Sequence, residues 1–291
     1  MVLLALGTTV ACGAAADEDA APSADDDIVG GTAEAKTSPA IGALASVFPT
    51  GADDAYDAFC TATLVAPQVV VTAEHCCLGA PGGKLAFVRG LHGSTDLSEG
   101  TGPDSAIEVL SCEGEPSVLG GALGLGSDIA VAILKTPVTN VKPLPIGQLS
   151  TSDVGKPFIA VGYGLREGGL RGDRRTATLK LFATSGATLH ALTSFEDYNS
   201  AFGGSEAKNR RSYDAIRLLD QYEIATGSGP GGPRLAKGDS GGPLLARRGG
   251  KLVVVGIASY VVGTPDDPGR FGSVHAVFGP AARDFVRGKI K

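Results

Sequence analysis

The sequence predicts a β-rich protein with many turns, and three observations lead to that prediction. Glycine accounts for 43 of the 291 residues and proline for 17, and both residues mark turns. Glycine does not recur with a period of three, which excludes a collagen-like chain. Apolar residues gather in short runs and, at 43% of the chain, they suffice for a packed core. The length fits one large all-β domain or two small barrels.

The first twelve residues predict an export segment. Val2–Ala11 form an apolar stretch of signal-peptide length, which is too short to cross a membrane as a mature helix. The basic residues expected before such a stretch are missing, because the first lysine is Lys36. The run Thr9-Val10-Ala11-Cys12 is similar to a bacterial lipobox, in which the cysteine becomes the lipidated first residue. Cys12 is therefore either a lipid anchor or, in an ordinary signal peptide, a discarded or free cysteine.

Residues 13–27 have a different composition, dominated by alanine, aspartate, glutamate, proline and serine. A tract of this kind cannot bury a core. We expect an acidic linker or a pro-segment here. The folded part of the chain is then expected to span residues 28–291.

Beyond the linker, short apolar runs predict a succession of strands. Most of the runs are rich in valine or isoleucine, although runs of this length do not exclude short helices. The runs extend over Cys60–Val65, Gln68–Thr72, Ile129–Leu134, Phe158–Gly162 and Leu252–Ser259.

One helix is predicted, at the end of the chain. Within Pro280–Ile290 the apolar residues recur at helical spacing, which favours a short amphipathic helix. Two segments rich in glycine or in charged residues, Arg166–Arg175 and Asn199–Arg211, predict exposed loops.

The charge balance argues against one class of function. The chain carries 25 basic and 31 acidic side chains, which gives a formal net charge of −6. Proteins that bind nucleic acids usually carry a clustered basic excess. We therefore expect no nucleic-acid partner.

The strongest chemical motif is Gly238-Asp239-Ser240-Gly241-Gly242-Pro243. Glycines beside Ser240 let a peptide backbone approach its hydroxyl closely. They also allow neighbouring backbone N–H groups to point at one oxygen, as an oxyanion hole requires. A serine is a weak nucleophile at neutral pH, so this one needs a base.

Two further motifs supply a base and an acid. His75 follows a β-prone run in Thr72-Ala73-Glu74-His75-Cys76, and the other three histidines are expected in surface or core roles. Asp128 opens the run Asp128-Ile129-Ala130-Val131. An aspartate in that place can fix the tautomer of an imidazole and stabilise the imidazolium.

With the order His75, Asp128, Ser240, the chain resembles the chymotrypsin/trypsin-like serine proteases, and it differs from the order in subtilisins and α/β-hydrolases. The resemblance covers about residues 28–291. It includes Ile28-Val29-Gly30-Gly31, which is similar to the family's mature N-terminus, and Val161-Gly162-Tyr163-Gly164, which is similar to a strand with a Gly-aromatic-Gly pattern. In this order the motifs together are highly specific.

The resemblance implies an all-β fold of two packed six-stranded antiparallel β-barrels with a short C-terminal helix. The catalytic residues would lie in the cleft between the barrels. The first barrel would supply His75 as the base and Asp128 as the residue that orients it. The second would supply Ser240, which attacks the scissile carbonyl.

The resemblance also assigns roles to residues around the serine. The backbone N–H groups of Gly238 and Ser240 would form the oxyanion hole. Asp239 would pair with the new α-ammonium of Ile28 after the pro-segment is cut. One departure from the family lies next to the histidine, because Glu74 replaces the usual small residue and could act on His75 or point to solvent.

By the same resemblance, Arg234, Ser259, Tyr260 and Val261 would bind the substrate. Arg234 takes the position of the pocket floor, where a guanidinium could bind an acidic side chain through a bidentate pair. Val261 would narrow the entrance in favour of aspartate. The tract Asp25-Asp26-Asp27, which stands where a basic residue is usual, would then be a self-processing site. Alternatively, Arg234 turns out of a pocket that takes small apolar residues.

The cysteines predict two disulfides. The resemblance implies a bond between Cys60 and Cys76 that braces the histidine loop. Setting Cys12 aside leaves an even set of four for an exported chain. Cys77 and Cys112 then remain, and Cys112 follows a β-prone run, so we predict a second bond between them. No metal site is expected, because further ligands at useful spacing are missing.

The resemblance thus implies an exported serine endopeptidase that hydrolyses peptide bonds through an acyl-enzyme. Its partners would be protein or peptide substrates, and no cofactor is implied. We expect a monomer that is secreted, or held at a bacterial envelope through lipidated Cys12. Two alternatives stay open. Glu74 is compatible with a catalytically silent homologue that binds partners, and the acidic linker with a surface-anchored binding lipoprotein.

Overall fold

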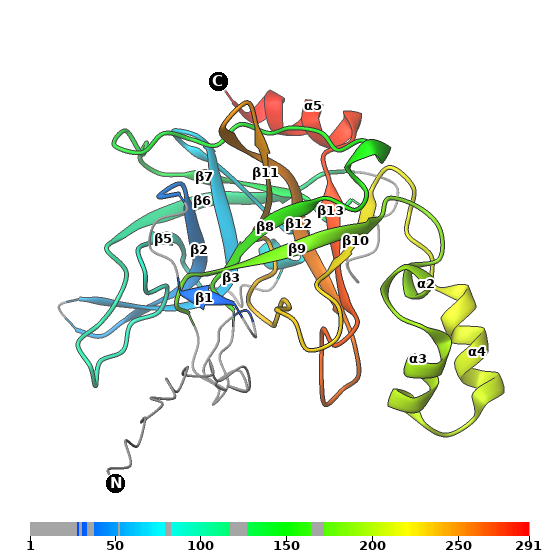
Figure 1. The fold of residues 1–291 in the computed structure, drawn as a ribbon. Helices are drawn as coiled ribbons and strands as arrows, with labels where there is room; N and C mark the ends of the chain where they lie inside the picture. Colours follow the sequence, from blue (N-terminus) through cyan, green and yellow to red (C-terminus); the bar gives the residue numbers. More distant parts are fainter. Residues whose placement is uncertain are drawn as a thin grey trace, which may run out of the picture.

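Two β-barrels form the body of the protein in the computed structural model (Figure 1). The structure describes residues 28, 31–33, 38–51, 53–78, 83–116, 127–164 and 172–290. The expected export segment and acidic linker, residues 1–12 and 13–27, lie outside the described residues.

The first barrel is closed by six antiparallel strands in the order β2-β3-β4-β7-β6-β5. The predicted apolar runs fill it, because all four residues of β4 are buried and Leu44, Leu64 and Phe87 are fully buried. The strands are β2 Ile41–Pro49, β3 Asp54–Ala66, β4 Val69–Thr72, β5 Leu85–Arg89, β6 Ser105–Gly114 and β7 Ala130–Leu134.

The second barrel closes in the same way. Strand β8 pairs with β9, and the antiparallel ring continues through β10, β13, β12 and β11 back to β8. A two-residue strand, β1, also pairs with β9. The expected fold of two six-stranded antiparallel barrels is therefore confirmed. The strands are β1 Thr32–Ala33, β8 Pro157–Gly162, β9 Arg175–Ala183, β10 Glu223–Gly227, β11 Pro243–Arg248, β12 Lys251–Val262 and β13 Gly272–Val277.

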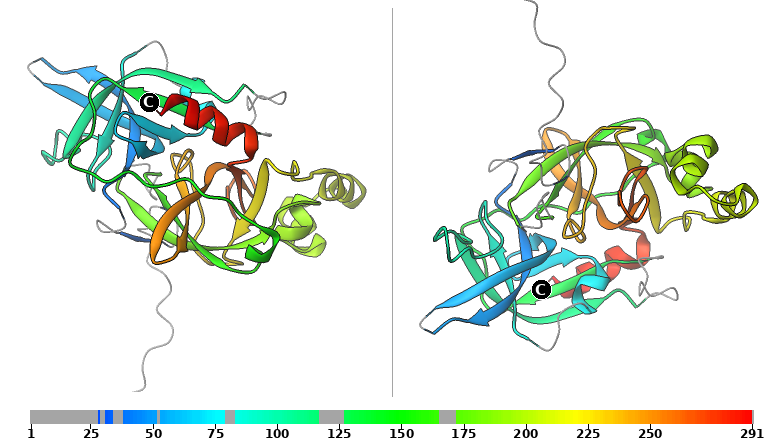
Figure 2. Two further views of the ribbon diagram at one scale, coloured as in Figure 1. Left: turned by 90° about the horizontal axis from the view of Figure 1, so that it is seen from above. Right: turned by 90° about the horizontal axis from the view of Figure 1, so that it is seen from below.

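The predicted C-terminal helix is α5, Pro280–Lys289, which begins with a proline in its first turn. It runs from the second barrel over the first (Figure 2). Ala282 and Val286 are buried in a core that contains side chains of both barrels. Lys289 Nζ also lies 2.6 Å from Glu113 Oε2 in β6. The helix therefore joins the two barrels on the side shown in Figure 2, left.

Three helices beside the second barrel correct a prediction (Figure 1). They are α2 Thr188–Leu192, α3 Phe195–Phe202 and α4 Glu206–Ala215, so the expected loop over Asn199–Arg211 is wrong. The helices form because aromatic rings on them share a core with a distant residue. Tyr198 and Tyr213 are buried, and the Tyr198 ring lies 5.9 Å from that of Phe271.

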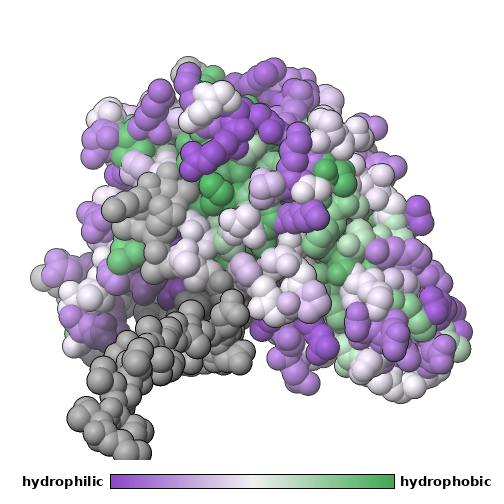
Figure 3. Space-filling model, viewed as in Figure 1, coloured by the Kyte–Doolittle hydropathy of each residue, from purple (hydrophilic) through white to green (hydrophobic). Residues whose placement is uncertain are grey.

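The other predicted loop, Arg166–Arg175, lies largely outside the described residues, and its last residue begins β9. A 3₁₀ turn, η1, covers Thr151–Asp153 before β8. In the described part of the chain, none of the helices combines the length and the apolar character needed to cross a membrane. On the face shown in Figure 3, apolar residues gather toward the middle, and hydrophilic residues are more frequent around them.

His275 in β13 is the one histidine that the fold buries completely among the described residues. Its Nδ1 lies 3.2 Å from Thr226 Oγ1, and its Nε2 has no protein partner among the described residues. Burial in this apolar barrel lowers the pKa of His275 to about 3. The folded chain therefore keeps this side chain neutral at moderately acidic pH.

We expect His275 to make the protein sensitive to acid. Below pH 6.5, the pKa of histidine in the unfolded chain, His275 is protonated in the unfolded chain, whereas in the folded chain it stays neutral down to about pH 3. The free energy of unfolding should fall by roughly 1.6 kcal/mol between pH 6.5 and 5 from this group alone. Urea unfolding at several pH values measures the effect. The free energy of unfolding of the His275→Gln variant should fall less steeply as the pH is lowered. An equal dependence on pH in both proteins would contradict this role of His275.

Candidate active site

The three predicted catalytic residues lie in segments that directly follow or precede strands. His75 lies in a short helix, α1 Glu74–Leu78, directly after β4. Asp128 immediately precedes Ile129 and β7, which pairs with β4. Ser240 lies in the turn before β11 of the second barrel. Because β4 and β7 are neighbours, the fold brings His75 and Asp128 together although 53 residues separate them.

A buried carboxylate holds the histidine. Asp128 is fully buried, and its Oδ2 lies 2.8 Å from His75 Nδ1, while its Oδ1 accepts the His75 backbone N–H at 3.1 Å. A buried carboxylate is costly unless it is hydrogen-bonded, and Ser259 Oγ adds a further donor to Oδ2 at 2.6 Å. The arrangement places the proton of the neutral imidazole on Nδ1 and leaves Nε2 able to accept another.

Sequence reasoning missed this role of Ser259. The resemblance placed the residue in the substrate-binding strand, but its hydroxyl donates to the carboxylate of Asp128, 131 residues away. The register of β12 against β13 shifts between Ala258 and Tyr260, so Ser259 lies at an irregularity of this strand pair. Sequence spacing carries no signal for such a bond.

The turn around Ser240 is fixed from both barrels. The Ser240 carbonyl accepts the Thr61 N–H of β3 at 2.7 Å, and the Gly241 N–H donates to the Ala258 carbonyl of β12 at 2.8 Å. Thr61 Oγ1 also donates to the Gly238 carbonyl at 3.0 Å. Gly238 and Gly241 have φ values of +102° and +82°, and a Cβ at Gly241 would overlap Thr61 and Thr72. Glycine is required here by conformation and by space.

The backbone of this turn offers two hydrogen-bond donors. Among the described residues, the N–H groups of Gly238 and Ser240 have no protein acceptor. Buried or partly buried N–H groups are normally paired, so two such donors beside a serine can hold an oxygen of a bound ligand.

Two cavities meet at Ser240. One, of about 410 Å³, is lined by both His75 and Ser240, together with Tyr163, Gly238 and the disulfide beside the histidine. The other, of about 480 Å³, is lined by Ser240 and by the four residues predicted to bind substrate, Arg234, Ser259, Tyr260 and Val261. The structure therefore brings all of these residues to one cleft.

The second cavity contains a charge pair that the sequence did not predict. Arg234 Nη2 lies 3.0 Å from Asp267 Oδ1, and both residues line the cavity. Burial, and secondly the Glu223 carboxylate, raise the pKa of Tyr260 in the same wall. The two acidic residues Asp266-Asp267, which follow the predicted strand Leu252–Ser259, were the available signal, but nothing in the spacing links them to Arg234.

Asp239 is buried under the turn. Its Oδ1 accepts the Gly164 N–H at 2.9 Å and its Oδ2 accepts the Ala236 N–H at 2.7 Å. A Cβ at Gly162 or Gly164 would overlap this carboxylate, which explains both glycines of the predicted strand motif. Ile28 is fully buried in the core of the second barrel.

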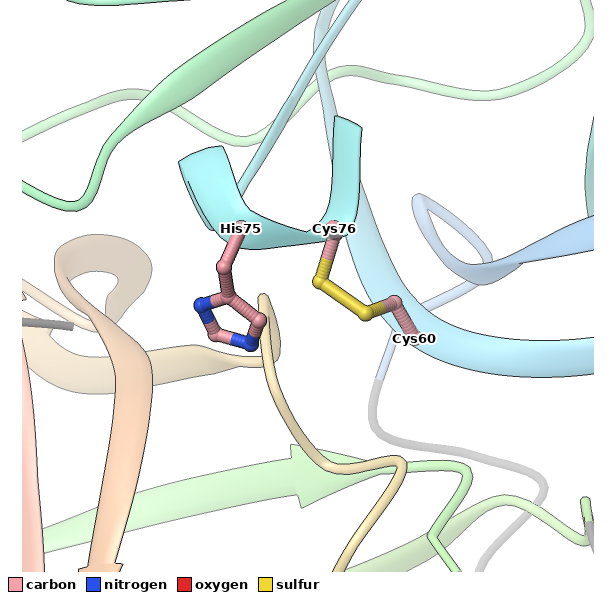
Figure 4. A group of neighbouring side chains, drawn as sticks. All are labelled: Cys60, His75 and Cys76. Atoms are coloured by element: carbon pink, nitrogen blue, oxygen red, sulfur yellow. A yellow bond between two sulfur atoms is a disulfide. The ribbon is translucent and has the colours of Figure 1, made fainter. Parts of the chain in front are cut away.

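Both predicted disulfides are present. Cys60 in β3 is bonded to Cys76, and Cys77 is bonded to Cys112 in β6, so consecutive cysteines tie α1 to two strands. Figure 4 shows the His75 ring beside the Cys60–Cys76 bond. These three residues could group around a metal ion by distance, but two sulfurs bonded to each other are not thiolate ligands.

Glu74 lies against the end of β6. A Cβ at Gly114 would overlap its carboxylate, so the absence of a side chain at Gly114 makes room for the larger residue. Glu74, which departs from the family pattern, is thus accommodated by Gly114 at the end of β6.

Comparisons with known proteins agree with this geometry. A family model described as Trypsin matches residues 28–279. A protein named Trypsin from Saccharopolyspora erythraea is 29% identical over 227 residues, which cover 76% of this chain and 84% of that protein. Trypsin-1 from Astacus astacus is 27% identical over 229 residues, which cover 74% of this chain and 83% of that protein.

Proposed function

We propose that this chain, which belongs to the trypsin family, is an exported serine endopeptidase that hydrolyses peptide bonds through an acyl-enzyme. The family acts on protein or peptide substrates, and two disulfides in such a domain are typical of an extracellular protein. The observation that carries the proposal is the His75–Asp128 pair on the same cavity as Ser240.

The residues suit each step of acyl transfer. His75 Nε2 takes the proton of the Ser240 hydroxyl while Ser240 Oγ bonds to the scissile carbonyl carbon. The carbonyl oxygen gains the negative charge and lies against the N–H groups of Gly238 and Ser240. Protonated His75 then gives its proton to the amine that leaves. In the second half, water loses a proton to His75 and its oxygen bonds to the acyl carbon. His75 then returns this proton to Ser240 Oγ as the bond between Oγ and the acyl carbon breaks and the acid product leaves.

An ester substrate tests this function through the acyl-enzyme. With chain that has been cut before Ile28, a p-nitrophenyl ester should release a burst of nitrophenol equal to the amount of enzyme before the slower steady state. Mass spectrometry of the quenched protein should find the acyl group on Ser240. The catalytically silent alternative predicts neither the burst nor the adduct, and the same holds for a binding lipoprotein anchored through Cys12.

Activation is the second part of the proposal. Cleavage before Ile28 would create an α-ammonium that pairs with Asp239. Ile28 has a φ of +47°, which is unusual for a β-branched residue. The φ angle of Ile28 includes the carbonyl carbon of residue 27, so cleavage of the bond between the two residues removes this constraint. Ile28 is fully buried in the core of the second barrel, the same barrel that carries the Asp239 turn.

We expect full activity only after this cleavage. In full-length chain carrying Asp27→Arg, bead-bound trypsin should cut before Ile28 and raise peptidase activity at least tenfold. The reason is that the ion pair of the Ile28 α-ammonium with Asp239 orders the Ser240 turn, and a hydrogen bond to a charged group contributes roughly 1.5–3 kcal/mol. Asp26→Arg is the matched control, since its cleavage leaves one extra residue before Ile28. Equal activity before and after cleavage, or equal activation of the control, would contradict the proposal.

A further inference from the structure

The cavity of about 480 Å³ receives the side chain next to the scissile carbonyl. Two cavities border Ser240, and the one that contains His75 lies on the leaving-group side, because His75 must pass its proton to the departing amine. The larger cavity is therefore on the acyl side. It is lined by Ser259, Tyr260 and Val261 of β12 and by Arg234.

An ion pair between Arg234 and Asp267 lies inside this cavity. Arg234 precedes the Ser240 turn and Asp267 lies in the connection from β12 to β13, with 3.0 Å between Nη2 and Oδ1. The connection is held in place by its own turn, in which the Asp267 N–H donates to Thr264 Oγ1 at 3.1 Å. Gly269 lets it approach, because a Cβ there would lie 2.8 Å from the Leu235 carbonyl oxygen.

The pair is accessible to a substrate. The side chains of Arg234 and Asp267 are 28% and 32% exposed. Among the described residues, Asp267 Oδ2 has no hydrogen-bond partner, and the guanidinium has five N–H donors, of which a single ion pair uses only part. The cavity thus presents free donors and a free acceptor side by side.

Two basic residues, Arg234 and Lys237, and three acidic residues, Asp239, Asp266 and Asp267, line the cavity. Because Asp239 is buried and accepts two backbone N–H groups, the charges that a substrate side chain meets are those of Arg234 and Lys237, opposed by Asp266 and Asp267. A substrate carboxylate would meet Asp267 beside the guanidinium, and a substrate cation would meet Arg234 beside the carboxylate. Like charges brought together in a partly buried site are costly. A carboxamide has one acceptor oxygen and one NH₂ donor, which match the two free groups.

We propose that Arg234 and Asp267 act jointly to select an uncharged carboxamide side chain, glutamine or asparagine, on the acyl side of the scissile bond. The selection rests on the proposed peptidase function. It replaces the expectation that Arg234 alone would favour an acidic residue. It also follows that the chain does not cut after Asp27 and that another protease must supply that cleavage.

A peptide series tests the selection. Full-length chain with Asp27→Arg is cut by bead-bound trypsin, and the same chain with Ser240→Ala, treated identically, gives the background. Peptides differ only in the residue that supplies the scissile carbonyl: Gln, Asn, Glu, Asp, Lys, Arg, Ala or Val. We expect kcat/KM for Gln or Asn to exceed the values for Glu, Lys and Ala by roughly tenfold or more. A leading Glu or Asp, Lys or Arg, or Ala or Val would overturn the proposal.

Two variants should shift the preference in opposite directions. Asp267→Asn leaves the guanidinium alone and should move the preference to Glu and Asp. Arg234→Gln leaves the carboxylates and should move it to Lys and Arg. Each shift should be roughly tenfold to a hundredfold. If neither variant changes the preference, or if both change it in the same direction, the proposal is contradicted. A fluorophosphonate adduct on Ser240 without these preferences rejects the selection alone, whereas no adduct and no hydrolysis above background rejects the peptidase function as well.

Discussion

Replacing Ser240 with alanine is expected to lower kcat for peptide hydrolysis by about 10⁶-fold. The Ser240 hydroxyl supplies the oxygen that bonds to the scissile carbonyl carbon, and it lines the cavity shared with His75. The oxyanion donors and substrate binding should leave a residual rate of roughly 10³–10⁴ over water. Steady-state hydrolysis by activated full-length chain measures the loss.

The fold should survive this substitution. The turn is fixed through backbone groups of Ser240 and its neighbours, which alanine retains. Ser205→Ala is a suitable control, because that serine is exposed at the start of α4 and its side chain makes no capping bond. Activity of the Ser240 variant within tenfold of the control would mean that the nucleophile lies elsewhere.

Asp128→Asn is expected to lower kcat by about 10⁴-fold while leaving substrate binding nearly unchanged. The aspartate accepts from His75 Nδ1 and from Ser259 Oγ. An asparagine offers an NH₂ group to one of these positions, which favours the imidazole tautomer with its proton on Nε2. That tautomer cannot take the proton of Ser240. Separate values of kcat and KM show whether the chemical step alone is affected.

The chain offers a matched control for this variant. His190 Nε2 lies 2.9 Å from Asp214 Oδ1 on the helices beside the second barrel, and both side chains are about half exposed. Asp214→Asn therefore removes a histidine–aspartate pair outside the cleft and should leave kcat within twofold. Equal losses in the two variants would show that the effect of Asp128→Asn is a general loss of structure.

The residues that we propose to be catalytic could be found in the sequence because their motifs are local. Glycines around Ser240 are required by positive φ values and by close packing on Thr61 and Thr72, and such requirements leave a mark in sequence. The apolar runs likewise become β4 and β7, whose pairing places His75 beside Asp128. The second disulfide followed from an even cysteine count once the first was assigned.

What could not be predicted depends on contacts between distant residues. The segment of α3 and α4 is polar in sequence, but Tyr198 and Tyr213 find their core through Phe271. The Arg234–Asp267 pair joins a segment before β11 to one after β12. Neither contact has a periodicity or a spacing that sequence alone reveals, and the second one changes the expected chemistry of the cavity.

The central claim, that Ser240 is a nucleophile activated by His75 and Asp128, is tested most directly by covalent labelling. Activated full-length chain is treated with a fluorophosphonate, digested and analysed by mass spectrometry. The account predicts one adduct, on Ser240, which is formed rapidly by the native chain and only very slowly by His75→Ala. An unlabelled Ser240 in folded chain with both disulfides intact, or equal labelling of the His75→Ala variant, would contradict it.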